Sequence, residues 1–384
     1  MFVKPTKLRP VFLEPLQIVR PVFPPLADFQ DAFGEALATG QVTNNGMWVQ
    51  TFEERLSAFL GVPTLVFSSG QAALLAMLRA AGITSGEVIT PSFTFAATPH
   101  AIVWSGARPV FAEIRDDMSF GVDPEDVERK ITKETTAILA VCPYGIPCDY
   151  AGLEAVAKRH GIPLLIDSAA AFGARVEDQL VGSRGDAQIF SFHATKAFAT
   201  MEGGALCTND ANLISAARAI RNFGLEGADA VLAGFNGKML EVCAMIGLLK
   251  LDVFEAEANQ RRNCVQRISK GLSDMDWLST GRAPEGVDPI WLYLPVTINT
   301  EKFGLDRDSV CDMLATQNLM VRKYYSPACH QMSAYANCET RGLQITERMA
   351  SEVVALPIYN NMTTAECDGI VECFRRVATQ LKVK

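Results

Sequence analysis

The sequence predicts an α/β protein, with a large domain built on a mostly parallel sheet between helices and a smaller C-terminal α+β domain. From about residue 64, short β-rich runs alternate with helical stretches, which is typical of parallel sheets covered on both faces. Small residues, prolines or capping side chains stand at the junctions, as in Ser69-Gly70 and Asp167-Ser168. With 384 residues, of which 49% are hydrophobic and 20% charged, the chain is long enough for two globular domains.

The first 63 residues predict two helices behind a proline-rich lead. Prolines interrupt residues 1–19, which we expect to form an N-terminal extension. Apolar residues recur at helical intervals over 26–39 and again over 52–60, and the polar stretch 41–48 between them predicts a turn.

The sheet and its helices follow in alternation. The expected strands are residues 64–69, 87–92, 108–114, 135–143, 162–167, 187–193 and 203–208. The expected helices are residues 71–82, 97–106, 149–161 and 210–224. Ligands of such sheets bind at the carboxyl ends of the strands, so we expect the functional site there.

The remaining residues predict the second domain. Residues 238–264 are helical in pattern, and later stretches mix a strand-like segment (291–298) with helix-like ones (308–318 and 366–382). No flexible linker marks the boundary. We place a large domain over 20–264 and a small domain over 265–384.

Composition excludes several classes of protein. A net charge of −8 disfavours nucleic acid or an anionic membrane as a partner. The ten cysteines form no C-x-x-C pair and no histidine stands at metal-ligand spacing, so we expect reduced core thiols and no metal. No window approaches the ~18 apolar residues of a membrane helix, and the lead lacks the apolar stretch of a signal peptide. We therefore expect a cytoplasmic protein.

Common motifs of other enzyme classes are missing. The sequence has no G-x-G-x-x-G after its first strand, no G-x-x-x-x-G-K-[ST], no G-x-S-x-G and no H-E-x-x-H. These absences count against dinucleotide-binding, P-loop, serine-hydrolase and zincin hypotheses.

Lys196 is the first candidate catalytic residue. It lies where the chain leaves a predicted strand, among small and apolar neighbours rather than other charges. Such a setting disfavours the ammonium form and suits an amine that forms a Schiff base. Taken alone, a solvated surface lysine is the commoner case.

Asp167 changes that balance. It ends the apolar run PLLID, where an acid is costly unless it caps the following helix or holds a cation. A protonated pyridine nitrogen is such a cation. Asp167 and Lys196 together point to pyridoxal phosphate, with the carboxylate at the ring nitrogen and the lysine on the aldehyde.

Three further features fit this cofactor. A Ser-Ser-Gly turn leads into a helix at residues 67–78 and aims free backbone amides at an anion. Ser191 either donates a hydroxyl to the same phosphate or caps its strand. Phe95 either stacks on the ring or belongs to the core.

A series of motifs resembles one family. SSGQAALLAML, EVITPSFTFAAT, PLLIDSAAAFGA, SFHATKAFATMEGG, RNFGLEG and GFNGKMLEVCAMIGLLKLD follow one another as in the DegT/DnrJ/EryC1/StrS family, over about residues 20 to 380. These are pyridoxal-phosphate-dependent aminotransferases of nucleotide sugars. Their fold is type I, or aspartate aminotransferase-like, which implies a seven-stranded sheet. PPLADFQ, GFNGKM and VRKYYSPACHQMSAY resemble enzymes that aminate carbon 4 of dTDP-4-keto-6-deoxyhexoses.

The resemblance implies roles for individual residues. Lys196 would bind the cofactor, Asp167 would pair with its ring nitrogen and Phe95 would stack on its ring. The phosphate would be held by Gly70, Gln71 and Ser191, and by Asn236 of the neighbouring subunit unless that amide only satisfies its own turn. His193 would be a second catalytic residue beside the cofactor. Lys238, Trp48, Tyr324 and Tyr325 would bind substrate. A site shared between subunits implies at least a homodimer.

Two positions depart from the family pattern. Gln71 stands where members usually carry Thr, so a bulkier amide replaces a hydroxyl near the phosphate. Ala170 stands where Gln, His or Glu is usual, which removes a polar group expected near the cofactor's 3-oxygen. Relatives with His at the lysine position are sugar dehydratases, so Lys196 favours amino transfer.

The expected function is transamination of a nucleotide-linked 4-keto-6-deoxyhexose, with dTDP as the expected nucleotide, to the 4-amino-4,6-dideoxy sugar. L-Glutamate is the expected donor, and pyridoxamine phosphate is the cofactor form between the half-reactions. Three alternatives stay open: a 3-aminotransferase acting on a 3-keto sugar nucleotide, a non-catalytic regulator or scaffold on the same fold, and an unrelated α/β binding protein.

Overall fold

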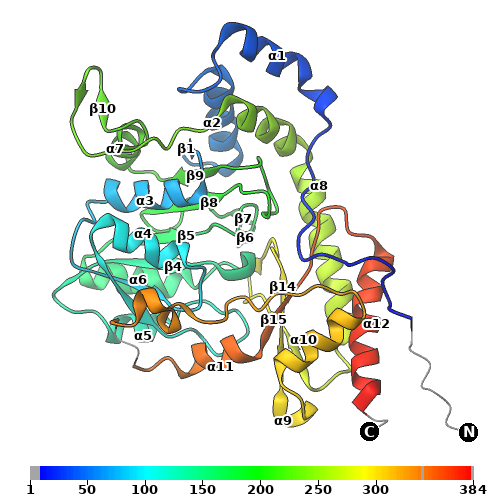
Figure 1. Ribbon diagram of the computed structural model, residues 1–384. Helices are drawn as coiled ribbons and strands as arrows, with labels where there is room; N and C mark the ends of the chain where they lie inside the picture. The colour runs from blue at the N-terminus through cyan, green and yellow to red at the C-terminus, as the bar shows by residue number, and fades with distance from the viewer. Residues whose placement is uncertain (1–8, 339–340, 382–384) are drawn as a thin grey trace, which may run out of the picture.

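A seven-stranded sheet forms the centre of the protein. The structure is a computed structural model that describes residues 9–338 and 341–381 (Figure 1). The strands are β1 (Thr64–Phe67), β2 (Glu87–Pro91), β3 (Arg108–Ala112), β4 (Thr135–Val141), β5 (Leu164–Asp167), β8 (Ala187–Ser191) and β9 (Gly204–Cys207). Their order is β1-β9-β8-β5-β4-β2-β3, and only the pairs that β9 makes with β1 and β8 are antiparallel. The prediction of a mostly parallel sheet is confirmed.

Helices cover both faces of this sheet. One face carries α3 (Gly70–Ala80), α4 (Ala97–Ser105) and α7 (Ala211–Arg221). The other carries α2 (Met47–Leu60), α5 (Pro124–Arg129), α6 (Tyr150–His160) and the first half of α8 (Glu241–Leu272). In β1, Leu65 and Phe67 pack on the first set of helices and Val66 on the second. The strands read as apolar runs because both of their faces are buried.

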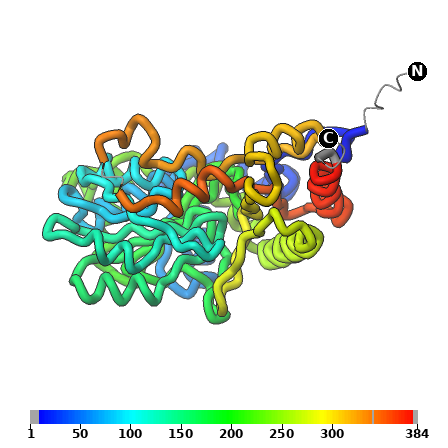
Figure 2. Tube along the Cα trace, turned by 90° about the horizontal axis from the view of Figure 1, so that it is seen from below, coloured from blue at the N-terminus to red at the C-terminus, as the bar shows by residue number. Residues whose placement is uncertain are grey.

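The C-terminal part is an α+β layer beside this unit (Figure 2). Its antiparallel sheet has the order β12 (Leu278–Thr280), β14 (Leu294–Ile298) and β15 (Val353–Leu356). Its helices are α9 (Thr300–Phe303), α10 (Arg307–Thr316), α11 (Gln344–Glu352) and α12 (Thr364–Leu381), and α12 packs along α8. The expected division between residues 264 and 265 falls inside α8, so the domain boundary stays a prediction.

Several short elements were not predicted from the sequence. They are η1 (Leu26–Asp28), β6 (Arg175–Val176), β7 (Gln179–Leu180), β10 (Leu225–Glu226), β11 (Asp229–Ala230), β13 (Val287–Asp288), η2 (Pro143–Gly145), η3 (Cys329–Gln331) and η4 (Ser333–Tyr335). With two to three residues each, they carry too little periodicity to be recognised. Helices α5, α9 and α11 and strands β12 and β15 were also not predicted.

The first two helices begin at other residues than expected. The helix expected over 26–39 is α1 (Gln30–Thr39), preceded by the single turn η1. Helix α2 starts at Met47 rather than Phe52, so the turn before it is shorter than the expected turn over 41–48. The cause is Glu241, whose buried carboxylate accepts the backbone N–H groups of Gly46, Trp48 and Val49 at 2.7, 3.0 and 3.1 Å. A carboxylate distant in sequence thus caps the helix.

An N-terminal strap, residues 9–22, crosses the C-terminal layer. Leu16 exchanges backbone hydrogen bonds with Asn318 and Met320, at 2.8 and 3.0 Å. Arg20 forms an ion pair with Glu366 at 2.7 Å, and its guanidinium lies 4.4 Å from the centre of the Tyr359 ring. The strap therefore joins residues from both ends of the chain.

The cysteines are free thiols. Nine of the ten are buried, and Cys338 is partly exposed. No cluster of three or more metal-ligating side chains occurs within residues 9–338 and 341–381. In the same part of the chain, no helix combines the length and apolar character that a membrane span requires.

Candidate active site

Two strands bring Asp167 and Ser191 to one edge of the sheet. Asp167 ends β5 and Ser191 ends β8, and these strands are parallel neighbours. The Asp167 carboxylate is buried. Its Oδ2 accepts a hydrogen bond from Thr98 Oγ1 at 2.7 Å, and its Oδ1 accepts the N–H of Ala169 at 3.0 Å.

Lys196 follows β8 in a tight turn. Its N–H donates to the carbonyl of His193 at 2.9 Å. Phe192 and Phe198 on either side are fully buried, with ring centres 5.0 Å apart, and both pack on Phe172. The lysine residue as a whole is partly exposed and lines a small cavity, while its turn is fixed.

Charge couples Asp167 and Lys196. Burial raises the pKa of Asp167, and the Thr98 hydroxyl, the Ala169 N–H and the charge of Lys196 act against that rise. Burial lowers the pKa of Lys196, and the Asp167 carboxylate acts against that fall. The acid and the amine therefore lie close enough for their charges to interact. Among the described residues, Lys196 forms no ion pair within 4.0 Å, which leaves its amine available.

Gly70 and Ser191 form a cradle at the start of α3. A Cβ on Gly70 would lie 2.7 Å from Ser191 Cβ, so only glycine lets this side chain approach the helix. The Ser69 hydroxyl caps α3 by accepting the N–H of Ala72 at 3.1 Å. The N–H groups of Gly70 and Gln71 precede the first intrahelical bonds and suit an anion. The donor set fits the phosphate of pyridoxal phosphate.

The two departures have structural consequences. Gln71 Nε2 donates to the carbonyl of Ala97 at 3.2 Å, so this side chain ties α3 to the start of α4. Ala170 packs against the core of the C-terminal layer, where the polar side chain usual in the family is missing. Phe95 is 61% exposed, which excludes the alternative that its ring belongs to the core.

His193 contacts two polar neighbours on the lysine side of the site. Its Nδ1 lies 2.9 Å from Thr195 Oγ1, and its Nε2 lies 3.5 Å from a carboxylate oxygen of Glu202. These contacts hold the imidazole over the lysine turn. A catalytic role for His193 stays a prediction.

The tyrosine candidates lie on the C-terminal side of the site. Tyr325 packs on Phe93 and Tyr144, with ring centres 5.5 and 5.6 Å apart. Burial raises the pKa of Tyr325, and the charge of Asp167 adds to this effect. Tyr324 packs on Tyr293, which lines the cavity of Lys196. Tyr325 therefore lies near the acid, and Tyr324 contacts a residue that lines the cavity of the amine.

Lys238 and Asn236 belong to a second cavity region. Lys238 Nζ donates to Asn222 at 2.9 Å and lines a cavity of about 670 Å³ together with Arg218 and Arg221. This cavity shares no residue with that of Lys196. Asn236 is exposed beside it. The backbone between them passes the end of β1, because the N–H of Ser68 donates to the carbonyl of Gly237 at 2.7 Å.

Trp48 lies in the first turn of α2 and packs partly against the core of the large sheet. The loop before it supplies Asn44 and Asn45 to the cavity of Lys238. Trp48 is thus close to the second cavity in sequence, but does not line it.

The structure adds residues that the sequence analysis missed. Thr98 touches Asp167, and Asn360 donates to the carbonyl of Ala197 at 2.9 Å, beside the lysine. Arg261 lines the same cavity, donates to Asn360 at 2.8 Å, and burial lowers its pKa to about 10. The distance of Thr98 in sequence hid its contact, although its place three residues after Phe95, on the following helix, was a usable signal.

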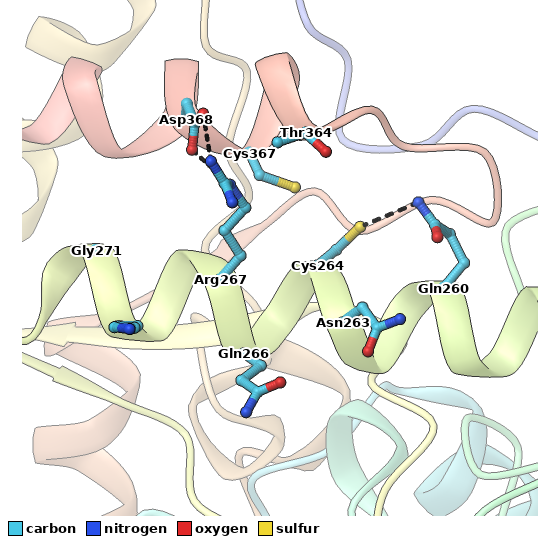
Figure 3. A pocket seen from close by; sticks show the side chains of 10 residues that line it. Gln260, Asn263, Cys264, Gln266, Arg267, Gly271, Thr364, Cys367 and Asp368 are labelled. Carbon is cyan, nitrogen blue, oxygen red and sulfur yellow. Dashed lines mark hydrogen bonds and ion pairs between the residues drawn. The ribbon is translucent and has the colours of Figure 1, made fainter.

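An open cavity elsewhere holds no predicted site residue. It measures about 830 Å³ and lies between α8 and α12, where Arg267 is held by both oxygens of Asp368 (Figure 3). The sulfurs of Cys264 and Cys367 face the gap between the helices. Its size does not mark the active site, since neither the acid nor the amine is there.

Comparisons with known proteins agree with this geometry. Residues 26–375 match the model of the DegT/DnrJ/EryC1/StrS aminotransferase family. The dTDP-4-amino-4,6-dideoxy-D-glucose transaminase of Shigella dysenteriae is 33% identical over 95% of this chain and 99% of its own. The dTDP-3-amino-3,4,6-trideoxy-alpha-D-glucose transaminase of Micromonospora megalomicea is 33% identical over 92% of this chain and 96% of its own.

A solved structure has the same fold. DesI, determined in the presence of its TDP-sugar product, is 36% identical, with a TM-score of 0.90 over 96% of this chain and 94% of DesI. The prediction of the aspartate aminotransferase-like fold is confirmed. This chain belongs to the DegT/DnrJ/EryC1/StrS aminotransferase family and is a pyridoxal-phosphate-dependent transaminase.

Proposed function

We propose that this enzyme converts a nucleotide-linked 4-keto-6-deoxyhexose, with dTDP as the nucleotide, to the 4-amino-4,6-dideoxy sugar, with L-glutamate as the amino donor. The observation that carries amino transfer is the buried carboxylate of Asp167 within electrostatic reach of the amine of Lys196 at one sheet edge. Two relatives support carbon 4. The transaminases of Shigella dysenteriae and Escherichia coli, 33% and 31% identical to this chain, are named for a 4-amino product.

The cofactor would supply the reactive groups, and the residues of the site would hold and orient it. When bound, pyridoxal phosphate supplies an aldehyde that takes up amino groups and a ring that accepts electrons. Asp167 would face the ring nitrogen, and Phe95 would cover one face of the ring. The N–H groups of Gly70 and Gln71 and the hydroxyl of Ser191 would hold the phosphate.

Lys196 would act as nucleophile and base. Because burial lowers the pKa of Lys196, its Nζ reaches the neutral form more easily than a solvated lysine does. A neutral Nζ can take a proton from the carbon that bears the amino group and return it to another atom. His193, held by Thr195 and Glu202, would steady the turn next to this amine.

Substrate binding would use both cavities. Lys238 and Arg218 are the cations of their cavity that would meet the diphosphate of a nucleotide sugar or a donor carboxylate, while Arg221 is paired with Glu53. Tyr324 and Tyr325 offer ring faces and hydroxyls to the sugar, and we assign Trp48 to the same task. Asn236 would reach the phosphate of the neighbouring subunit.

We further propose a homodimer. Phe95, Val103 and Trp104 expose 61%, 49% and 65% of their surface and lie on α4 or just before it. Apolar side chains gathered in this way mark contact surfaces. A second copy would cover them and bring its Asn236 to the phosphate.

The test is a product assay. The purified protein, with added pyridoxal phosphate, is incubated with L-glutamate and a panel of 3-keto and 4-keto sugar nucleotides, and products are identified by mass and NMR. An amino group at carbon 4 supports the proposal. Amination at carbon 3 alone would show the alternative substrate class, and no amination of any sugar would refute the function.

Two lysine variants control this assay. Lys196→Ala should lose both turnover and the visible absorbance of the lysine-bound cofactor. Lys270→Ala, an exposed lysine in the cavity between α8 and α12, should keep both. Full turnover by the Lys196→Ala variant would contradict the role of this amine.

A further inference from the structure

Two threonine hydroxyl groups in series, which the proposed function does not use, hold the Asp167 carboxylate. We call this series the hydroxyl relay. Thr98 Oγ1 donates to Asp167 Oδ2 at 2.7 Å, and Thr94 Oγ1 lies 3.0 Å from Thr98 Oγ1. Thr94 and Thr98 are 2% and 1% exposed, so water does not compete for these hydrogen bonds.

The direction of the relay follows from proton counting. An ionised carboxylate can only accept, and each hydroxyl has a single proton to donate. The proton of Thr98 therefore points to Asp167, and that of Thr94 points to Thr98. Both dipoles are aligned toward the carboxylate, and each hydrogen bond strengthens the other.

Hydrogen bonds to the C-terminal part of the chain hold the segment that carries these threonines. Ser92 Oγ lies 2.7 Å from His330 Nδ1 and accepts the N–H of His330 at 2.9 Å. The carbonyl of Ser92 accepts the N–H of Cys329, also at 2.9 Å. The same segment carries the exposed Phe95, so the candidate ring-stacking residue and the threonines lie on one stretch of chain.

We propose that Thr98 is a positioning residue, which keeps one oxygen of the Asp167 carboxylate charged and in place toward the ring nitrogen of the cofactor, and that Thr94 orients the Thr98 hydroxyl. The proposal rests on the role of Asp167 in the proposed function. It has a physical basis in the burial of the acid. Burial raises the pKa of Asp167 and the Thr98 hydrogen bond acts against it, so removal of the hydroxyl leaves the pKa higher.

Thr98→Val removes the hydroxyl and keeps the shape. Thr98→Ser restores a hydroxyl and serves as the rescue. Thr90→Val is the matched control, because the Thr90 hydroxyl is equally buried in β2 and has no partner among the described residues. Urea unfolding of each cofactor-free variant shows whether it folds.

The first measurement uses the cofactor-free protein. Carbon-13 NMR of the aspartate carboxyl groups, with Asp167→Asn to assign the signal, gives the titration of Asp167. We expect Thr98→Val to titrate at higher pH than the unaltered protein, and Thr98→Ser and Thr90→Val to titrate as it does. A Thr98→Val titration that matches the unaltered protein, or an equal shift in Thr90→Val, would overturn the proposal.

The second measurement uses the enzyme with bound cofactor. It separates an effect on the position of the Asp167 carboxylate from an effect on the stability of the fold. Since Thr98→Val removes a direct hydrogen bond to the charged group at the ring nitrogen, we expect it to lower kcat about tenfold or more, with KM nearly unchanged. Thr98→Ser should recover most of this loss. A loss that Thr98→Ser does not recover, or one explained by lower stability alone, contradicts the proposal.

Failure of the proposed function can be distinguished from failure of the Thr98 proposal, because the two are tested by different measurements. If the unaltered protein aminates no keto sugar, that function fails, while the cofactor-free titration still decides whether Thr98 controls the charge of Asp167.

Discussion

At the scale of single residues, the site depends on an acid that burial disfavours. Asp167 is 5% exposed and accepts from one hydroxyl and one N–H, with Lys196 as the nearby positive charge. Burial of a carboxylate without a direct ion pair costs stability. Before the cofactor binds, this acid therefore weakens the fold, and bound cofactor with a protonated ring nitrogen would offset that cost.

This predicts a pH-dependent gain in stability for Asp167→Asn in the cofactor-free protein. Because the pKa of Asp167 is raised above its usual 3.8, the folded chain holds an extra proton in that range, and stability falls as pH rises through it. Below 3.8 the variant and the unaltered protein should differ least, and at neutral pH the variant should be more stable. Urea unfolding from pH 3 to 8 measures this, and a difference that does not vary with pH would contradict it.

A second residue-scale prediction concerns Gly70. In Gly70→Ala the new Cβ would lie 2.7 Å from Ser191 Cβ, which forces the phosphate cradle apart. Overpacking costs about 1–3 kcal/mol, so pyridoxal phosphate should bind about tenfold more weakly or worse. Gly34→Ala is the control, because nothing lies within 4 Å of a Cβ there. Equal cofactor affinity of both variants, measured by absorbance titration, would show that the cradle lies elsewhere.

Single site residues could be predicted only where local sequence carries the signal. Asp167 at the end of an apolar run and Lys196 after a strand were visible, since their position relative to the sheet edge follows from pattern alone. Thr98 and Asn360 were missed because their contacts join segments 69 and 163 residues apart. Gln71 was expected at the phosphate; its side chain donates to the carbonyl of Ala97, so its backbone N–H is the group that we propose for the phosphate.

At the scale of elements, the lysine turn is held by an aromatic cluster. The Phe198 ring lies 4.6 Å from Phe172 and 5.4 Å from Phe254, and these contacts join the turn to α8. Asn360 adds a hydrogen bond from the loop before α12 to the carbonyl of Ala197. The position of Lys196 thus depends on packing from three separate elements.

Phe198→Ala should therefore destabilise the protein by about 3–5 kcal/mol and reduce turnover in the fraction that stays folded. The cavity left beneath the turn loosens the lysine. Phe23→Ala, at a ring that is 36% exposed, should change stability by about 0.5 kcal/mol or less. Thermal unfolding and activity at low temperature test this. A stable, fully active Phe198→Ala variant would disprove that the cluster positions Lys196.

The strands of the large sheet and most of its helices were predictable, whereas most of the shortest elements were not. The seven strands and four intervening helices follow from periodicity because each is fully or half buried. The early start of α2 was hidden, since the carboxylate that caps it belongs to Glu241, almost two hundred residues later. The β10–β11 hairpin is too short and too exposed to leave a pattern.

At the scale of the whole molecule, the proposed dimer makes a measurable prediction. Trp104→Glu places a charge on the exposed face of α4, so it should dissociate the dimer and lower activity in parallel. Leu13→Glu, at an equally exposed apolar residue of the N-terminal strap, should do neither. Sedimentation velocity across protein concentrations gives the result. A monomeric unaltered protein that is fully active would rule out a shared site.

The N-terminal strap constrains the order in which parts of the protein can fold during synthesis. Residues 18–22 line the cavity of Lys196, but the strap is anchored by residues near 318, 361 and 366. A ribosome synthesises these anchors last. The segment made first therefore gains these anchors only when nearly the whole polypeptide has emerged, so in a nascent chain stalled before residue 318 the strap lacks all of them.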